Sequence, residues 1–349
     1  MENAQEKPKK SGGRHGLLLL VFIALNIAAS LIMPPILPHI QIAPEILVGP
    51  FEVPIIGSFA LTNTMIAMLI GDVILILIAW NFRRATRKGD VVLSGFNNAF
   101  EAVLEAIYNL VESTAGKWTG FIFPWVATII LVVLVANWME LIPGVDSIGM
   151  LHEAHGDAAG HPVQELFRIG DFSVTTLVKH AAEEGSHSNG HQYGLIPFVR
   201  VNSTDLNFTL ALALVSVFMT QVIGVKSLGV SYFNKFFAVG GIFKLLKKRP
   251  LGASDVMMPL LDIFLGFLEL IAEFARIISF TFRLFGNIFA GSVLLFVIGS
   301  LVPVLIQTVF VGLEFFVGFI QALVFGMLTM VFMFMAAQGH GEHEEEGAH

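Results

Sequence analysis

An arginine lies in the middle of a long apolar run near the C-terminal end of the sequence. The run extends from Val256 to Ala337, and Arg283 lies within its segment SFTFRLFGNIFAG. A charge at the centre of a bilayer costs about 2.5–3.5 kcal/mol on insertion scales, so such a residue is a candidate functional group. The positions three and four residues away hold Ser279, Phe280, Gly286 and Asn287. None of these is acidic, so we expect the counter-charge of Arg283 to come from another helix or another chain.

Arg283 belongs to a stripe of polar residues on one face of the predicted helix. With about 100° of rotation per residue, the stripe occupies an arc of about 80° and extends over about 37 Å. It consists of Asp262, Glu269, Glu273, Arg276, Arg283 and Asn287. The next apolar segment carries a second polar line at a spacing of seven residues, formed by Gln307, Glu314 and Gln321. Ionisable groups within membranes often mark ion paths, so the two polar lines predict an ion path. The alternative is that these groups only neutralise each other, as Glu273 and Arg276 could do at a spacing of three residues.

Such a path needs membrane helices to position it, and the composition predicts them. Of the 349 residues, 55% are apolar and 13% are charged, whereas soluble domains have about 25% charged residues. Apolar runs of about 20 residues predict spans at 16–38, 57–80, 119–141, 206–225, 256–299 and 301–337. The last two exceed one straight crossing, so we expect them to be tilted, bent or broken, with Gly299, Ser300 and Pro303 marking the turn between them. The fold class is an all-α integral membrane protein with five to six membrane helices.

The distribution of basic residues predicts the orientation of these spans. Lys and Arg cluster at the N-terminus, after the second span and before the fifth. The connection at 144–205 is acidic and His-rich instead. Because cytoplasmic loops carry the excess of Lys and Arg, we expect 144–205 outside and the C-terminus in the cytoplasm. The first segment, with its basic start and the run GLLLLVFIALNIAAS, is either an extra membrane helix or a cleaved signal peptide.

Two features outside the polar lines allow more than one interpretation. Residues 95–116 have the spacing of an amphipathic helix, which would lie on the membrane surface, against a partner, or over the protein's own loops. Asp72 lies in the middle of the second span. It is either a relay group or, in the interpretation that we favour, a local partner of Asn63 or Thr64.

Several kinds of chemistry are disfavoured by the sequence. It contains no cysteine, so disulfides and thiolate chemistry are excluded. It shows neither a Gly-rich phosphate loop nor a nucleic-acid motif. His152 and His155 with Asp157 could bind a metal, but we interpret them as part of a solvated polar segment. We therefore predict no cofactor, no resident metal and no nucleic-acid partner, and we interpret residues 339–349 as an acidic tail.

The motif FRLFGNIFAG resembles the signature of subunit a of F-type ATP synthases, the stator subunit of the rotary motor in the membrane. The segment FIQALVFGMLTMVFMFMA resembles the last helix of that family, and NWMELIP and NSTDLNFTLALAL resemble its earlier spans. The resemblance covers roughly residues 90–338. We divide the chain into an N-terminal extension at 1–56, which holds the signal peptide or extra membrane helix, a membrane domain at 57–338 and the tail at 339–349. The first 50 residues and the insert at 150–195 lie outside the resemblance.

The resemblance implies a proton-translocating stator subunit that makes no ATP alone and provides two half-channels. Its last two helices would form a hairpin against a rotor ring of small two-helix subunits, each bearing one carboxylate. Peripheral stalk subunit b and membrane lipids would be its other partners, in a bacterial plasma (inner) membrane. Arg283 would face the ring carboxylates and block a proton short circuit, because arginine cannot be deprotonated in proteins.

The resemblance also assigns a proton path. Glu269 and Glu273 fall where the family often places acids before the arginine, and Asn287 follows within the motif. Gln321 falls on the last-helix glutamine that faces the arginine, and Glu314 falls where the family has His or Glu. The polar positions attributed to the outer half-channel are matched by Asn137, Glu140, Ser203 and Asp205.

The sequence departs from the family pattern at three positions, which are Arg276, Ile277 and Ser292. The family often has Lys-Pro at the first two and Glu or His at the third, so Glu314 would carry the titratable role alone. The alternative function is a proton-coupled secondary transporter with an intramembrane Arg–Glu pair. Such folds often show duplicated halves, and we find no internal repeat, which disfavours this alternative.

Overall fold

The computed structural model describes residues 42–54, 57–87, 95–153, 161–169, 172–178, 193–236, 253–301 and 305–338, together with residues 21, 24, 27 and 28. Five helices in this part are long and apolar enough to cross a membrane. The predicted class, an all-α integral membrane protein, is therefore confirmed. The segment at 16–38 and the tail at 339–349 lie almost entirely outside the described residues. The predicted hairpin against a rotor ring stays a prediction.

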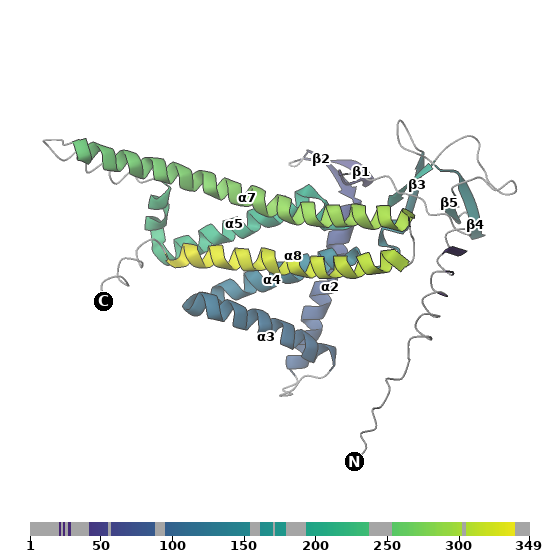
Figure 1. The fold of residues 1–349 in the computed structure, drawn as a ribbon, viewed down its shortest axis with the longest axis horizontal. Helices are drawn as coiled ribbons and strands as arrows, with labels where there is room; N and C mark the ends of the chain where they lie inside the picture. Colours follow the sequence, from purple (N-terminus) through teal and green to yellow (C-terminus); the bar gives the residue numbers. More distant parts are fainter. Residues whose placement is uncertain are drawn as a thin grey trace, which may run out of the picture. The chain divides into compact units, whose positions relative to one another are not determined.

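The described helices, drawn in Figure 1, correspond to predicted spans and to the predicted amphipathic helix at 95–116, with differences at their ends. They are α2 (Asn63–Thr86), α3 (Phe96–Ala115), α4 (Thr119–Met139), α5 (Leu206–Leu228), α7 (Ala253–Leu301) and α8 (Leu305–Gln338). Short 3-10 turns are η1 (Gly116–Trp118), η2 (Val145–Ser147), η3 (Asn202–Thr204) and η4 (Gly229–Lys235). The expected start of the second span at residue 57 is wrong, because residues 57–62 form a strand. The turn residues Gly299 and Ser300 still belong to α7.

Side-chain caps fix where two of these helices begin. The Thr62 side chain accepts a hydrogen bond from the Met65 N–H at the start of α2, and the Asp205 carboxylate accepts one from the Asn207 N–H at the start of α5. Threonine and aspartate are preferred at this position because they satisfy N–H groups that have no intrahelical partner. Helix α5 ends at Gly229, whose φ of +64° is rare for residues with a side chain.

The chain divides into two compact units. One consists of residues 1–41, 146–198 and 290–316, and the other of residues 42–145, 199–289 and 317–349. The second unit, which we call the helical unit, holds a continuous apolar core between α3, α4, α5, α7 and α8. Leu284 and Met330 are almost fully buried there. The predicted amphipathic helix at 95–116 is α3, and it buries Ile107, Val111 and Ala115 in this core.

Close contacts join α8 to its neighbours within the helical unit. Phe280 of α7 packs against Phe325 and Phe332 of α8, with ring centroids 4.9 Å and 5.8 Å away. The Ser216 and Thr329 hydroxyls of α5 and α8 lie 2.7 Å apart. These contacts hold α8 between α5 and α7, so side chains from all three helices can reach a shared site.

Within the described residues, three two-stranded antiparallel sheets lie in the connections between the helices. In the helical unit, β1 (Ile46–Val53) pairs with β2 (Gly57–Thr62). In the other unit, β3 (Gly149–Glu153) pairs with β6 (Tyr193–Pro197), and β4 (Val163–Ile169) pairs with β5 (Phe172–Leu177). None of these strands was predicted. The alternating, β-branched sequence FSVTTL of β5 carries the signal that could have identified one of them.

Candidate functional site

Arg283 lies on α7 and is exposed at the surface of the chain. Its Nη2 donates a hydrogen bond to the Ser279 Oγ at 3.2 Å. Within the described residues, no carboxylate forms an ion pair with Arg283. The neighbouring Phe282 is also exposed, at 57%. A permanent charge on an exposed apolar helix of a membrane protein is expensive unless an opposite charge approaches it, so this position suits a partner outside the described chain.

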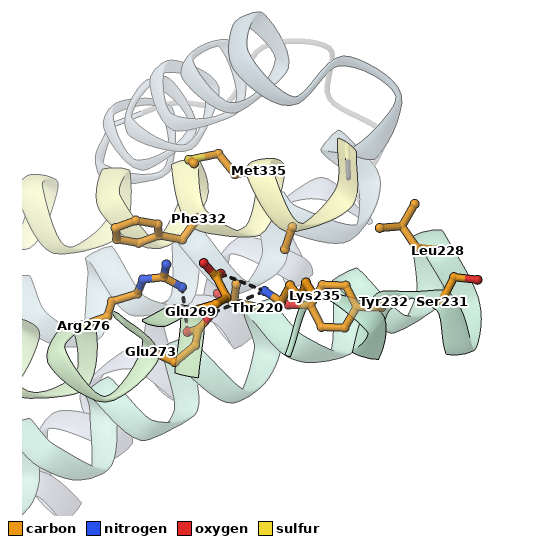
Figure 2. A pocket seen from close by; sticks show the side chains of 11 residues that line it. Thr220, Leu228, Ser231, Tyr232, Lys235, Glu269, Glu273, Arg276, Phe332 and Met335 are labelled. Carbon is orange, nitrogen blue, oxygen red and sulfur yellow. Dashed lines mark hydrogen bonds and ion pairs between the residues drawn. The ribbon is translucent and has the colours of Figure 1, made fainter. Parts of the chain in front are cut away.

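Four charged side chains meet beside the part of α7 that lies about two to four helical turns before Arg283, and we call them the ion-pair cluster. They are Lys235, Glu269, Glu273 and Arg276. The Arg276 Nη1 lies 2.7 Å from the Glu273 Oε2, and the Lys235 Nζ lies 3.4 Å from the Glu273 Oε1 and 3.5 Å from the Glu269 Oε1. Arg276 and Lys235 approach the Glu273 carboxylate from opposite sides, and Lys235 also reaches Glu269 (Figure 2). Glu273 is buried and Glu269 is partly exposed.

Aromatic rings hold the two cations of the ion-pair cluster. The Arg276 guanidinium lies 3.9 Å from the centroid of the Phe332 ring, and the Lys235 Nζ lies 4.4 Å from the Tyr232 ring and 4.5 Å from the Phe236 ring. Cations are attracted to the negative faces of such rings. The cluster opens into a cavity of about 370 Å³ between η4, α7 and the end of α8 (Figure 2). The carboxylates therefore lie beside a space large enough for several water molecules.

The packing divides the predicted polar stripe into two parts. The Glu273 side chain is only 9% exposed, since η4 and α8 cover it. Asp262, Arg283 and Asn287 share its helix face but are exposed. The ion pair between Glu273 and Arg276, which was the alternative to an ion path at these two residues, is present, and Lys235 is an additional member that was not predicted.

A second group of polar side chains lies where α4 ends and α5 begins, and we call it the hydroxyl–amide cluster. It consists of Thr64, Asn137, Ser203 and Asp205, all at most 6% exposed. The Ser203 hydroxyl donates to the Asn137 Oδ1 at 2.7 Å, and the Asn137 Nδ2 donates to the carbonyl of Gly318 on α8 at 3.0 Å. The Thr64 hydroxyl donates to the Asp205 Oδ2 at 2.8 Å.

The structure thus brings three predicted residues of the outer path together in the helical unit, Asn137, Ser203 and Asp205. The fourth, Glu140, is the C-cap residue of α4, and both of its carboxylate oxygens are shielded from solvent. Gln321 of α8 is partly buried. Among the described residues, Gln321 and Arg283 form no hydrogen bond with each other.

Glu314 belongs to the other unit, where it packs against α7. Its side chain is buried, with the residue 6% exposed. A Cβ atom on Gly291 would overlap the Glu314 carboxylate, so a larger residue there would force the carboxylate to move. The Glu314 Oε1 is buried and has no hydrogen-bond partner among the described residues. A buried carboxylate oxygen without a donor is costly, which marks Glu314 as a residue kept for more than packing.

The favoured interpretation of Asp72 is wrong. Its suggested partners are engaged elsewhere, since Asn63 bonds to Glu45 and Thr64 bonds to Asp205. Asp72 instead lines a small cavity beside Gly71.

Of the suggested metal ligands, His155 and Asp157 lie outside the described residues. Within the described residues, no group of three or more potential metal ligands occurs.

Comparison with known proteins adds a family to this geometry. The family model described as ATP synthase A chain matches residues 64–334. The chain is 28% identical to ATP synthase subunit a of Mycobacterium bovis over 292 residues, which cover 82% of this chain and 92% of the relative. It is 27% identical to ATP synthase subunit a of Syntrophobacter fumaroxidans (82% and 88% covered) and 29% identical to that of Pseudoalteromonas translucida (75% and 80% covered). The range matched by the family model includes every residue predicted for the proton path.

Proposed function

Because the chain belongs to the ATP synthase A chain family, we propose that it is the proton-translocating stator subunit of a rotary F-type ATP synthase. One observation carries this proposal. Arg283 is an exposed cation on a membrane helix, and no described carboxylate forms an ion pair with it. A rotor ring whose subunits each bear a carboxylate would supply the missing charge at every step of rotation. A peripheral stalk subunit b would hold the chain against the moving ring.

In this mechanism Arg283 separates two half-channels. A ring carboxylate that has lost its proton is attracted to the guanidinium, and the attraction is strong because little water screens it. The arginine keeps its charge because it cannot be deprotonated. A proton therefore cannot pass directly from one half-channel to the other and must travel on the ring.

The outer half-channel would use the hydroxyl–amide cluster together with Glu140 and Glu314. Support comes from the burial of Asn137, Ser203 and Asp205, which are polar yet almost inaccessible to solvent. Such groups are retained in membrane proteins mainly where a path or a structural bond needs them. Glu314, with its unbonded buried oxygen, would be the titratable group that passes protons to the ring.

The inner half-channel would begin at the cavity of the ion-pair cluster. The cavity admits water to Glu269 and Glu273, and it lies on α7 before Arg283. Lys235 and Arg276 neutralise the two carboxylates between proton transfers. Asn287, on the exposed face of α7 beyond Arg283, would line the surface that faces the ring.

The test of the proposed function is the substitution Arg283→Ala. We expect ATP synthesis and ATP-driven proton pumping to be abolished while the complex still assembles, because among the described residues Arg283 makes only one hydrogen bond, to Ser279. Arg283→Lys should not restore full activity, because a desolvated ammonium can lose its proton. Arg84→Ala, which removes an exposed cation at the end of α2, is the control. Normal ATP synthesis in membranes containing Arg283→Ala would refute the proposal.

Glu314→Gln tests the assigned relay separately. The substitution keeps the shape and removes the exchangeable charge, so proton uptake into vesicles stripped of the catalytic head should fall by about 100-fold, the typical loss when a proton-transfer group is removed. Glu314→His should restore part of the rate. Glu105→Gln, on the exposed face of α3, is the control. Wild-type conduction by Glu314→Gln would make Glu314 only a structural residue.

The proposed topology places 144–205 outside and the C-terminus in the cytoplasm. The chain contains no cysteine, so single cysteines can be labelled without background. A membrane-impermeant maleimide added to intact cells should reach Arg168→Cys on β4 but not Arg84→Cys after α2. The opposite result would invert the topology. The proposal also keeps the division of the chain into an N-terminal extension at 1–56, a membrane domain at 57–338 and a tail at 339–349.

A further inference from the structure

The β1–β2 hairpin joins α2 beside the hydroxyl–amide cluster. The register that pairs Ile46 with Thr62 brings Glu45 next to Asn63. The Asn63 N–H donates to the Glu45 carbonyl at 3.1 Å, the Glu45 N–H donates to the Asn63 Oδ1 at 3.2 Å, and the Asn63 Nδ2 donates to the Glu45 Oε2 at 3.3 Å. All of these residues precede the range that the family model matches.

Two threonine hydroxyls form a directed chain at this junction. The Thr62 and Thr64 Oγ1 atoms lie 3.1 Å apart, and the Thr64 Oγ1 donates to the Asp205 Oδ2 at 2.8 Å. A hydroxyl has one hydrogen to donate. Because Asp205 receives the hydrogen of Thr64, Thr62 must be the donor in the Thr62–Thr64 bond. The chain of donors therefore points from Thr62 through Thr64 to the carboxylate of Asp205.

The exposure of these groups decreases along the same direction. Thr62 and Glu45 are partly exposed, whereas Thr64 is 2% and Asp205 is 6% exposed. The hydroxyls thus connect a solvent-accessible point with a carboxylate that solvent reaches poorly. The same end of the helical unit holds Ser203 and Asn137, which continue toward α8 through the carbonyl of Gly318.

We propose that this junction is the proton-uptake point of the outer half-channel, with Thr62 and Thr64 as a hydroxyl wire to Asp205 and Glu45 as the anion at its mouth. The inference rests on the proposed function and adds to it Thr62 and Glu45, which lie outside the matched family range. A hydronium ion gives a proton to the Thr62 Oγ1 and becomes water, while the Thr62 hydrogen moves to the Thr64 Oγ1 and the Thr64 hydrogen moves to the Asp205 Oδ2. Both hydroxyls end neutral, Asp205 ends protonated, and rotation of the hydroxyls restores the chain.

A purely structural role for Thr62 makes a different prediction. The Thr62 Oγ1 also accepts the Met65 N–H at 3.4 Å and so caps α2. Asparagine caps helices at least as well as threonine, but it has no hydroxyl to relay a proton. Thr62→Asn therefore separates capping from conduction, whereas Thr62→Ser retains both.

The experiment measures acid-driven proton uptake into vesicles that carry the whole complex without its catalytic head. We expect Thr62→Ser to conduct like the wild type and Thr62→Asn to conduct at least about tenfold more slowly, less than the ~100-fold typical of a lost proton-transfer group because water can partly replace the hydroxyl. The control is Thr86→Asn. The exposed hydroxyl of Thr86 donates to the carbonyls of Phe82 and Arg83 at the other end of α2. Equal amounts of assembled complex are verified for each variant. Wild-type uptake by Thr62→Asn would overturn the inference.

A second pair of variants tests Glu45 and keeps the inference testable if Thr62→Asn fails to assemble. Glu45→Gln preserves an acceptor for the Asn63 amide but removes the charge, so half-maximal uptake should require a more acidic outer solution at an unchanged maximal rate. Glu52→Gln, exposed on the same hairpin, should behave like the wild type. Among the described residues, the charged groups at the junction include Asp205, which binds Thr64, and Arg200, whose Nη1 donates to the carbonyl of Ala43. An unshifted half-maximal pH in Glu45→Gln would remove Glu45 from the path.

The design also separates this inference from the proposed function. Asp205→Asn is included as a variant of the outer half-channel itself. Slow uptake by Asp205→Asn with normal uptake by Thr62→Asn and Glu45→Gln would refute the uptake point alone. Vesicles that conduct no protons even with the wild-type chain would refute the proposed function.

Discussion

The ion-pair cluster and the hydroxyl–amide cluster lie in the same unit but are stabilised in opposite ways. The first joins four charges, with nitrogen–oxygen distances of 2.7–3.5 Å, beside a cavity of about 370 Å³. The second holds one carboxylate among neutral donors and acceptors, with distances of 2.7–3.0 Å and no more than 6% exposure. The first cluster is built from ion pairs and faces a cavity, whereas the second is built mainly from hydrogen bonds of neutral groups and is almost inaccessible to solvent.

Because of this difference, the loss of one partner should cost a different amount of stability in each cluster. Removal of one partner from a buried ion pair leaves a charge without compensation, which costs about 3–5 kcal/mol. Removal of one partner from a neutral hydrogen bond leaves a single unsatisfied group, which costs about 1–3 kcal/mol. The charged cluster should therefore determine stability, while the hydroxyl–amide cluster can change its proton occupancy at a smaller structural cost.

The largest effect should come from breaking the charged cluster with Glu273→Gln. Of the two carboxylates in the ion-pair cluster, only Glu273 contacts both Lys235 and Arg276. Its neutralisation leaves the guanidinium of Arg276, whose side chain is 17% exposed, without an anion. We expect the free energy of unfolding to fall by about 3 kcal/mol. The measurement is thermal unfolding in detergent, followed by circular dichroism of the helices.

The matched control for Glu273→Gln is Glu101→Gln on α3. Glu101 is exposed, so its neutralisation should change the unfolding free energy by no more than about 0.5 kcal/mol. An equal decrease in both variants would show that the charge of Glu273 contributes nothing to stability. The two clusters would then not differ in the way that their contacts suggest.

The helices were predictable from the sequence because the apolar runs determine them. The segments at 119–141, 206–225 and 256–299 correspond to α4, α5 and α7 with shifts of only a few residues. The predicted start of α2 is too early. The apolar run that predicts this helix begins within residues 57–62, but these residues form β2. Apolar content alone cannot distinguish a short strand from the first turns of a helix.

The contacts within the clusters were less predictable. The Glu273–Arg276 pair follows from their spacing on one helix. Lys235 was read only as a member of a basic loop, because nothing local indicates that η4 folds back over α7. Thr64 and Asp205 are 141 residues apart, and a single sequence provides no signal for such a pair. The family resemblance identified Asp205 but not its donor.

A smaller effect should come from breaking the hydroxyl–amide cluster with Ser203→Ala. The substitution removes the donor to the Asn137 Oδ1, which is buried with the rest of the residue. We expect a loss of about 2 kcal/mol in the free energy of unfolding, the cost of one buried unsatisfied acceptor. Ser113→Ala on α3, whose hydroxyl is exposed and bonds to the Leu110 carbonyl, is the control. A decrease larger than that of Glu273→Gln would reverse the comparison between the clusters.

The smallest effect should come from Lys235→Met, which removes one charge and keeps most of the apolar stem. Glu273 retains Arg276 at 2.7 Å, and Glu269, whose side chain is 34% exposed, can be hydrated from the cavity. The methionine can still pack against the Tyr232 ring, so the loss should be about 1 kcal/mol or less. The same unfolding measurement checks it, with Lys117→Met, an exposed lysine in η1, as the control. A loss as large as that of Glu273→Gln would mean that Lys235, and not Arg276, neutralises Glu273. The cluster would then depend on the fold of η4 rather than on a pair within α7.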